Sequence, residues 1–288
     1  MAERDALVGR IAAAFPELAF SNADLIESGD DHQIVLLDGE WVFRFPRTVE
    51  RERLFRVELG VLSALRGRIL AALPDYRFLP PSRDFGGYPL IEGEPLDCAR
   101  FAALTAGRRD RILGELAQFL RAIHALSPRV ITGEDAEPAR EWTPAMWRDR
   151  YRQARRAEIY QSVEEALLAR IDDFYDAFVD RPASGRESVI HGDLSGDHLL
   201  VGQESPLGII DFGDACLGDP AYDFTFFFAW GEGPARRIAE LYDRGRKDPG
   251  LLERARWSYA RSRIEKLRRG RDEAVIAEVE KTLARLGI

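Results

Sequence analysis

The sequence is poor in lysine and cysteine. Of its 41 basic residues only Lys247, Lys266 and Lys281 are lysines. Any chemistry that needs a cation in the first 246 residues must therefore use arginine. The two cysteines, Cys98 and Cys216, are too few for a disulfide framework or a cysteine-based zinc cluster. We expect both to be reduced residues that pack in the interior.

Long apolar runs are also absent. No stretch reaches the roughly 18 apolar residues that a membrane-spanning helix needs. The N-terminal segment carries acids and predicts an amphipathic helix rather than a signal peptide. We therefore expect a cytoplasmic protein without a membrane partner. The net charge of −8 argues against nucleic acid as a partner, and it fits a small cationic substrate better than an anionic one.

The first third of the chain has the pattern of a small sheet with one long helix. Short β-like segments are separated by turns, and the dipeptide Asp38-Gly39 is typical of a β-hairpin. Apolar residues recur with helical spacing over 51–69. The predicted strands cover residues 23–30, 32–39, 40–46, 76–79 and 88–91.

The rest of the chain is predicted to be mainly helical. Segment 91–97 contains a Gly and a Pro with little periodicity, which indicates a linker between two lobes. Two strand–loop segments, 189–201 and 206–218, interrupt the helices, and each places Asp and Gly beside a short apolar strand. Such an arrangement predicts a cleft between the lobes. The predicted helices cover residues 107–126, 143–159, 162–180 and most of the chain after 220.

Two short aspartate-containing motifs, the acidic strings, indicate the chemistry of the protein. They are His191-Gly-Asp193 and, eighteen positions after Asp193, Asp211-Phe-Gly. Phosphoryl transfer needs one carboxylate to orient the nucleophile and oxygen ligands for Mg²⁺. If a hairpin brings the two strings together, Asp193 would accept a substrate hydroxyl's proton and Asp211 would hold the metal. The alternative is that His191 braces a buried loop and the acids only form turns. For His191 this alternative is partly expected, but the paired acids favour catalysis.

The wording of these strings, HGDLSGDHLLV and GIIDFGDACLGDPAYDF, resembles the aminoglycoside phosphotransferases, most closely their 2''-phosphotransferase branch. His198 stands where protein kinases have Asn, as it also does in macrolide phosphotransferases. The resemblance implies a bilobal, protein-kinase-like α+β fold. A small N-terminal lobe with an antiparallel sheet and one long helix would bind nucleotide, and a hinge would lead to a larger, mainly α-helical lobe with the catalytic loops. These parts would cover residues 1–91, 92–97 and 98–288.

The activity implied is transfer of the γ-phosphate of ATP or GTP to a hydroxyl of an aminoglycoside, as in antibiotic resistance. The resemblance makes Asp193 the catalytic base and gives Mg²⁺ to Asp211 and His198. Because imidazole suits softer metals better than magnesium, a structural hydrogen bond is the alternative role for His198.

For the nucleotide, the resemblance places a cation on the third strand and a carboxylate on the following helix. Arg44 occupies the position where the family usually has lysine, and Glu58 is the matching acid by helical register. An ordinary strand-surface arginine is the competing interpretation of Arg44. Backbone groups near Pro89 and Ile91 would contact the purine. Ser28 is a weak candidate in a phosphate-covering turn that lacks a glycine-rich motif.

A polycationic acceptor would need a cleft lined by acids. We expect His124 to be a packed helix residue, and Asp219 and Asp223 to brace the loop and the next helix. Two other functions remain open: the same chemistry on a macrolide, a choline-like amine or a sugar metabolite, and a catalytically silent kinase-like module that binds nucleotide or a partner. The candidate substrate contacts are Asp197, Asp214, Glu232, Trp257 and Glu265.

Overall fold

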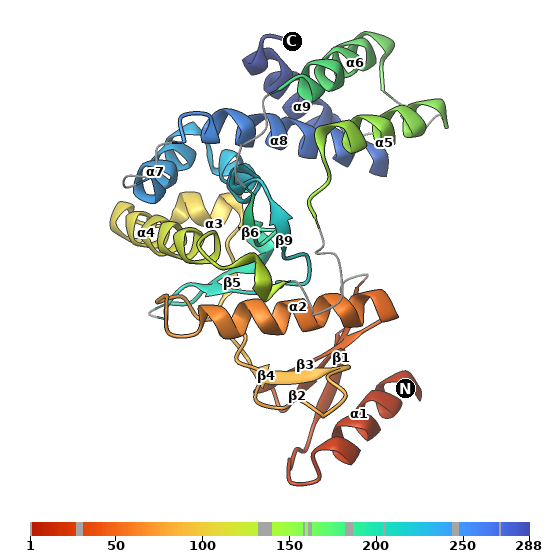
Figure 1. Cartoon of the computed structure of the whole chain (residues 1–288), viewed down its shortest axis with the longest axis vertical. Coiled ribbons are helices and arrows are strands. Elements are labelled where there is room, and N and C mark those ends of the chain that lie inside the picture. The colour runs from red at the N-terminus through yellow and green to blue at the C-terminus, as the bar shows by residue number, and fades with distance from the viewer. Residues whose placement is uncertain are drawn as a thin grey trace.

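A computed structural model describes residues 2–26, 31–131, 140–157, 159–160, 163–181, 187–203, 205–243, 248–270 and 272–288. It has a small lobe at the N-terminal end and a larger helical lobe, with the two termini at opposite ends of the molecule (Figure 1). The mixed α/β architecture, with an antiparallel N-terminal sheet and a mostly helical remainder, confirms the predicted fold class. No helix of the described residues is both long and apolar enough to cross a membrane.

The small lobe is a four-stranded antiparallel sheet with the strand order β1-β2-β3-β4. Asp38 and Gly39, both with positive φ, form the tight turn between β2 and β3 that the sequence predicted. Alternate residues of the central strands point into a core shared with α1. The elements are α1 (Ala2–Ala14), β1 (Ala23–Ile26), β2 (His32–Leu37), β3 (Trp41–Pro46), α2 (Val49–Leu65) and β4 (Gly86–Pro89).

The last part of this sheet differs from the prediction. Segment 76–79 makes only an isolated bridge, between Phe78 and Gly87, because prolines flank it and limit regular pairing. β4 starts two residues before the predicted strand, at Gly86. Glycine has a low strand propensity, but a Cβ at position 87 would overlap the ring of Phe43. Close packing at this point therefore requires Gly87.

Helix α2 joins the two lobes. It follows an N-cap in which Thr48 accepts a hydrogen bond from the backbone N–H of Arg51. Its last turns bury Val61 and Leu65 in the central apolar core of the larger lobe. In Figure 1, α2 lies between the sheet and the helical lobe. This helix can therefore hold a side chain of the small lobe in a fixed position relative to the loops that carry Asp193 and Asp211.

The larger lobe has a central core and an outer helical layer. The central core gathers residues of α2, α4, the short strands and the long 3₁₀ segment η3. A second apolar cluster joins α5, α6, α8 and α9, which lie at the end of the molecule farthest from the sheet (Figure 1). The helices are α3 (Cys98–Ala103), α4 (Ala106–Ile123), α5 (Pro144–Arg156), α6 (Glu165–Val179), α7 (Glu232–Tyr242), α8 (Leu251–Lys266) and α9 (Glu273–Leu286), with 3₁₀ segments η1 (Pro128–Val130), η2 (Gly196–His198), η3 (Pro220–Trp230) and η4 (Leu267–Arg269).

The strands of the larger lobe form two small sheets instead of one hairpin. β7 and β8 pair with each other, and the predicted linker contributes β5 to their outer edge. β6 pairs with β9. Asp193 lies in the loop after β6, and Asp211 lies in the loop after β8. The two acidic strings therefore follow strands of two different small sheets. The strands are β5 (Glu94–Pro95), β6 (Ser188–Ile190), β7 (Leu199–Val201), β8 (Gly208–Ile209) and β9 (Cys216–Gly218).

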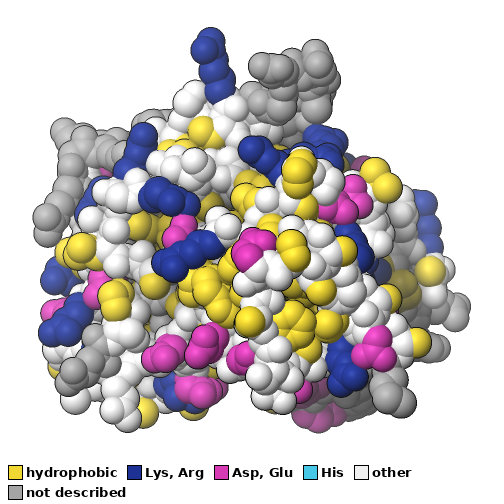
Figure 2. Space-filling model, turned by 90° about the horizontal axis from the view of Figure 1, so that it is seen from below, with side chains coloured by type: hydrophobic (Ala, Val, Ile, Leu, Met, Phe, Trp, Pro, Cys, Tyr) yellow, Lys and Arg dark blue, Asp and Glu magenta, His cyan; other side chains and the backbone are white. Residues whose placement is uncertain are grey.

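The outer surface of the small lobe, which faces the viewer in Figure 2, mixes acidic and basic side chains with apolar ones. Neither the acidic nor the basic side chains form a continuous patch on this face. Cys98 is exposed and Cys216 is buried, and both are free thiols. The expectation of two reduced cysteines is met, although only Cys216 packs in the interior.

Candidate active site

The loop after β6 is held by buried polar contacts. His191 is fully buried; its backbone N–H donates to Asp223 at 2.9 Å, and its Nε2 donates to the carbonyl oxygen of Ile210 at 3.1 Å. Burial lowers the pKa of His191, so the ring is neutral. These contacts make His191 a link between the two acidic strings.

Gly192 and Asp223 complete this support. Gly192 has φ +85°, and a Cβ there would overlap the backbone oxygen of Asp214. Asp223 also accepts from the backbone N–H of Gly192 and from His124 Nε2, at 3.1 and 3.0 Å. Burial alone would raise the pKa of Asp223, but the hydrogen bond and electrostatic interaction with His124, together with the hydrogen bond from the backbone N–H of His191, hold it below its usual value. His124 and Asp223 thus occupy the packing and bracing positions that the sequence indicated.

Asp193 projects from this loop beside the imidazole of His198. Asp193 Oδ2 lies 3.6 Å from Nδ1 of that ring, and Nδ1 donates to the backbone oxygen of Asp193 at 2.6 Å. The pKa of Asp193 is raised to about 6, first because its surroundings desolvate the carboxylate, and further because Asp214, Asp211 and Asp197 lie near; His198 acts in the opposite direction. A carboxylate with this pKa can accept a proton at neutral pH.

Asp211 lies at the other nitrogen of the same ring. Its Oδ2 is 3.6 Å from His198 Nε2. The residue adopts φ +63°, a conformation that non-glycine residues rarely use, and Phe212 anchors it by packing against His191 at 4.7 Å between ring centroids. One imidazole therefore contacts both carboxylates, which brings the two acidic strings to a single site.

Arg44 connects this site to the small lobe. Its Nη1 donates to Glu58 Oε1 at 2.8 Å, and its Nη2 donates to Asp211 Oδ1 at 2.7 Å. Arg44 is 4% exposed and Glu58 is fully buried, which excludes an ordinary strand-surface arginine. Burial alone would raise the pKa of Asp211, but Arg44 and then His198 outweigh it and lower the pKa to about 2.

The chemistry of the donors allows a test of whether they fit magnesium. Because Nδ1 of His198 donates to the backbone oxygen of Asp193, Nε2 is the ring nitrogen that could offer a lone pair to a metal, and it faces Asp211. Arg44 occupies Oδ1 of Asp211 and leaves Oδ2 beside that lone pair. Among the described residues, no group of three His, Cys, Asp or Glu side chains could hold a metal by itself. Magnesium needs few protein ligands when phosphate oxygens and water complete its coordination shell. One carboxylate and one imidazole fit this requirement.

Two residues of this site were missed by the sequence analysis. The Nδ1 atom of His32, on β2, lies 3.2 Å from Arg44 Nη2, and Tyr76 donates its hydroxyl to Glu58 at 3.0 Å. Burial and then the charge of Arg44 lower the pKa of His32 to about 3. The residue opposite Arg44 on β2 is Ile34, so strand register alone did not single out His32.

The remaining nucleotide candidates lie at the edge of the small lobe. Pro89 is the last residue of β4, and its nitrogen has no hydrogen to donate. Leu90 donates its N–H to the carbonyl oxygen of Glu40 at 2.7 Å, so Ile91 begins the connection toward β5. Ser28 lies outside the described residues. Contact of Pro89 and Ile91 with a purine stays a prediction.

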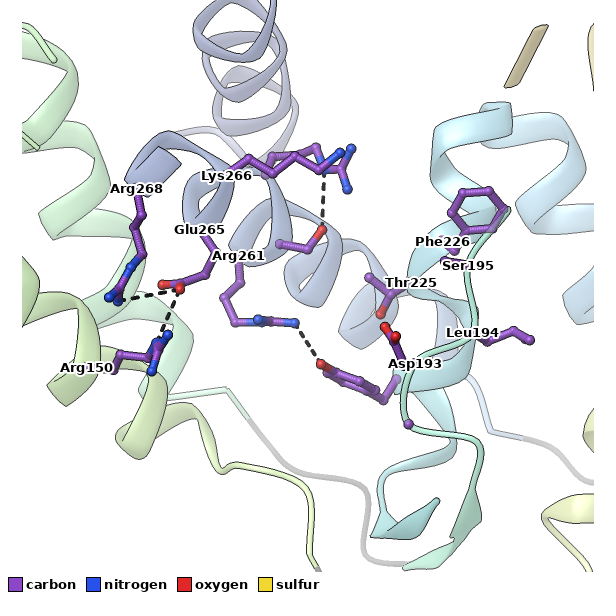
Figure 3. A pocket seen from close by; sticks show the side chains of 14 residues that line it. Arg150, Asp193, Leu194, Ser195, Thr225, Phe226, Arg261, Glu265, Lys266 and Arg268 are labelled. Atoms are coloured by element: carbon purple, nitrogen blue, oxygen red, sulfur yellow. Dashed lines mark hydrogen bonds and ion pairs between the residues drawn. The ribbon is translucent and has the colours of Figure 1, made fainter. Parts of the chain in front are cut away.

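A pocket of about 590 Å³ opens beside Asp193 on the side away from the small lobe. The loop that carries Asp193 forms one wall, and η3, α8 and η4 form the others, with one contribution from α5. In Figure 3, Glu265, Arg150 and Arg268 lie across this pocket from Asp193. The position of Asp193 between the metal candidates and this pocket is the arrangement that an acceptor hydroxyl would need.

The predicted substrate contacts are dispersed. Only Glu265 lines the pocket with Asp193. Asp214 accepts from Arg51 at 3.1 Å, and Glu232 accepts from Arg256 at 2.6 Å. Trp257 is 3% exposed and stacks on Phe174 and on the guanidinium of Arg181, so it belongs to the outer helical core and borders a second pocket of about 370 Å³. Asp197 is exposed at η2.

The two-lobed fold, with Asp193 and Asp211 beside one imidazole, matches the arrangement that the sequence predicted for a phosphotransferase. A family model for the phosphotransferase enzyme family matches residues 24–260. The chain therefore belongs to the phosphotransferase enzyme family. A search among curated proteins finds no match.

Solved structures with the same fold include aminoglycoside and macrolide phosphotransferases. The GDP and kanamycin complex of APH(2'')-IIIa has a TM-score of 0.74 and 23% identity, with 97% of each chain covered. The streptomycin–ATP complex of APH(2'')-IIa has a TM-score of 0.64 and 17% identity, with 90% of this chain and 89% of that chain covered. The macrolide 2'-phosphotransferase MphH from Brachybacterium faecium has a TM-score of 0.64 and 23% identity, with 97% and 98% covered.

Proposed function

We propose that the protein transfers the γ-phosphoryl group of a nucleoside triphosphate to a hydroxyl of a small molecule held in the pocket beside Asp193. The observation that carries this proposal is the position of the His198 ring, whose two nitrogens lie 3.6 Å from Asp193 Oδ2 and 3.6 Å from Asp211 Oδ2. One carboxylate can thus serve the acceptor while the other faces the nucleotide.

Asp193 orients the acceptor hydroxyl and takes its proton as the oxygen attacks the γ-phosphorus. Asp211 and His198 would hold Mg²⁺, which when bound neutralises negative charge on the phosphate oxygens. Arg44 keeps Asp211 ionised and in place. ATP and GTP are both candidate donors, because backbone contacts near Pro89 and Ile91 could serve either purine.

Two acceptor classes compete. The sequence resemblance predicts an aminoglycoside, and the kanamycin and streptomycin complexes with the same fold support this class. The pocket itself supports another small alcohol, because basic side chains outnumber acidic ones in its lining. A cationic acceptor would meet like charge there.

The experiment that tests the shared chemistry is a phosphotransfer screen with γ-labelled ATP and GTP, magnesium and a panel of hydroxyl compounds that includes kanamycin. We expect a labelled phosphomonoester whose formation requires magnesium and is lost in Asp193→Ala. A catalytically silent kinase-like module would instead bind magnesium–nucleotide and transfer nothing to any acceptor. That outcome would refute the proposed activity.

A further inference from the structure

The charge of the acceptor pocket is opposite to that of the whole chain. The protein carries a net charge of −8, yet the pocket beside Asp193 is lined by five basic side chains and only two carboxylates. The carboxylates are Asp193 itself and Glu265. The basic side chains are Arg150, Arg261, Arg263, Lys266 and Arg268.

Internal ion pairs neutralise only part of this charge. Arg263 lies 3.6 Å from Glu278, which lies outside the lining. Glu265 is shared by two guanidiniums, with Arg150 Nε at 3.3 Å and Arg268 Nη1 at 3.7 Å. Figure 3 shows both arginines converging on this one carboxylate. Because two cations share one anion, this wall keeps an excess positive charge.

Arg261 adds a buried guanidinium. It is 5% exposed, donates from Nη2 to the hydroxyl of Tyr222 at 3.0 Å and lies over the ring of Trp147 at 4.0 Å. Among the described residues, Arg261 makes no ion pair, and its Nε atom has no hydrogen-bond partner. Its charge acts on Glu141, but burial raises the pKa of that carboxyl group to about 8, so Glu141 is mostly protonated at neutral pH. A buried charge without a counter-ion is unfavourable, so this arrangement points to an anion from outside the chain.

The lining of this pocket includes a second residue with an unpartnered polar atom. Thr225, on η3, lines the same pocket, and its buried Oγ1 has no hydrogen-bond partner within the described parts of the chain. In Figure 3, Thr225 and Asp193 point toward one another, and Arg261 lies between them and the Glu265 wall. Polar groups that are satisfied only by a ligand are typical of substrate sites.

We propose that the acceptor is an alcohol that also carries an anionic group, a carboxylate or a phosphate, and this rests on the proposed phosphotransfer. The anion would lie against Arg261 and the Arg150–Arg268 wall, because guanidinium groups match the oxygens of either anion in a forked geometry. The acceptor hydroxyl would lie at Asp193.

The reaction balances without a further reagent. The hydroxyl oxygen forms a bond to the γ-phosphorus, and the bond from that phosphorus to the β–γ bridging oxygen breaks. The hydroxyl proton passes to the Asp193 carboxylate. The products are a nucleoside diphosphate and a phosphomonoester that keeps the original anionic group.

Acceptor pairs that differ only in charge test the proposal. D-gluconate is compared with D-glucitol, and D-glucose 6-phosphate with D-glucose, using kanamycin as the polycation. Turnover is followed with magnesium and ATP or GTP, and affinity is titrated in the presence of a non-hydrolysable nucleotide. We expect the anion of at least one pair to exceed its neutral partner by about tenfold or more in kcat/KM or affinity. The pair that does so separates carboxylate from phosphate.

Glu265→Gln provides the sharpest contrast between acceptor classes. Because it removes a negative charge from the pocket, it should leave an anionic acceptor bound as tightly or more tightly. Lys266→Gln should weaken the same acceptor about three- to tenfold. The matched control is Arg237→Gln, which removes one positive charge from α7 outside the pocket and should not change the preference.

Neutral acceptors or kanamycin that equal or exceed the anions in both readouts would overturn the proposal. Loss of kanamycin binding in Glu265→Gln would identify that carboxylate as a contact for a cation. Magnesium-dependent transfer to kanamycin alone would overturn the anionic acceptor and leave phosphotransfer standing. If neither transfer to any acceptor nor magnesium-dependent nucleotide binding occurs, the underlying phosphotransfer function fails as well.

Discussion

The two sides of Asp193 differ in how their charges are balanced. On the side of the small lobe, Arg44 contacts both Glu58 and Asp211, and His198 bridges Asp211 to Asp193. On the acceptor side, cations exceed carboxylates. The difference shows that pairing within the protein fixes the groups on the small-lobe side, whereas the pocket beside Asp193 keeps charge that the proposed acceptor would neutralise.

The largest effect should come from the residue between the two sides. In Asp193→Asn the carboxylate can no longer accept a proton, and general-base catalysis contributes about 10²–10⁴-fold. We expect turnover with any accepted substrate to fall by about 10³-fold while the melting temperature changes little, because the side chain makes no buried ion pair. Steady-state kinetics and thermal unfolding check both statements. Near-normal turnover would remove Asp193 from its assigned role.

The charge balance on the small-lobe side of Asp193 depends on Arg44, which pairs with Glu58 and Asp211. Arg44→Met leaves Glu58 buried without its ion-pair partner, which typically costs about 3–5 kcal/mol in the free energy of unfolding. The double variant Arg44→Met/Glu58→Leu should recover most of this loss, because no uncompensated charge remains. Chemical denaturation measures both variants. Equal stability of Arg44→Met and the wild type would show that the Arg44–Glu58 pair does not balance this side.

Loop geometry is tested at Gly192. Gly192→Ala places a Cβ against the backbone oxygen of Asp214 at a residue with φ +85°, so the loop must move. A shift of about 1 Å at a catalytic group can cost on the order of 10²-fold in rate. We expect this loss in kcat with nucleotide affinity retained. Gly233→Ala, where a Cβ would meet nothing within 4 Å, is the matched control and should leave kcat unchanged.

The arrangement on the small-lobe side of Asp193 could be predicted from sequence because it depends on short motifs and on helical register. Asp193 and Asp211 each follow a short apolar strand, and helical register alone selected Glu58 as the partner of Arg44, which the 2.8 Å contact confirms as a pairing. The hairpin prediction was only partly correct, since β6 pairs with β9 and β7 with β8. Short strands do not specify their partners without tertiary packing.

The acceptor side could not be predicted in the same way. Its cations come from α5, α8 and η4, which only the folded chain brings together, and the net charge of −8 suggested the opposite preference. The basic residues within 261–268, on α8 and η4, could have indicated a local excess of positive charge. The net charge of the whole chain does not show this local excess. Trp257 was predicted to contact the substrate, yet its ring packs in a core that only tertiary contacts define.

The smallest effect on turnover is expected at Glu141, which lies outside the lining of the pocket beside Asp193. Its Oε2 accepts from the backbone N–H of Asp219 at 3.1 Å, and burial raises the pKa of Glu141 from 4.5 to about 8. Because the folded-state pKa lies above the ordinary value, stability is fully present at low pH and is lost as pH rises from about 4.5 to about 8.

Glu141→Gln removes this titration. We expect the variant to gain stability over the wild type between pH 5 and pH 8, by up to about 1.4 kcal/mol per pH unit. Urea unfolding at both pH values measures the difference. Glu187→Gln, an exposed carboxylate that lines the same second pocket, should show no such trend and serves as the control. A pH-independent Glu141→Gln difference would contradict the raised pKa.

The central claim is that Asp211 serves the metal–nucleotide and Asp193 serves the acceptor. Titration of a non-hydrolysable nucleotide with and without magnesium, into the wild type, Asp193→Asn and Asp211→Asn, tests it most directly. The account predicts that magnesium strengthens nucleotide binding in the wild type and in Asp193→Asn but has little effect in Asp211→Asn. An undiminished magnesium effect in Asp211→Asn, or its loss in Asp193→Asn, would contradict this division of roles.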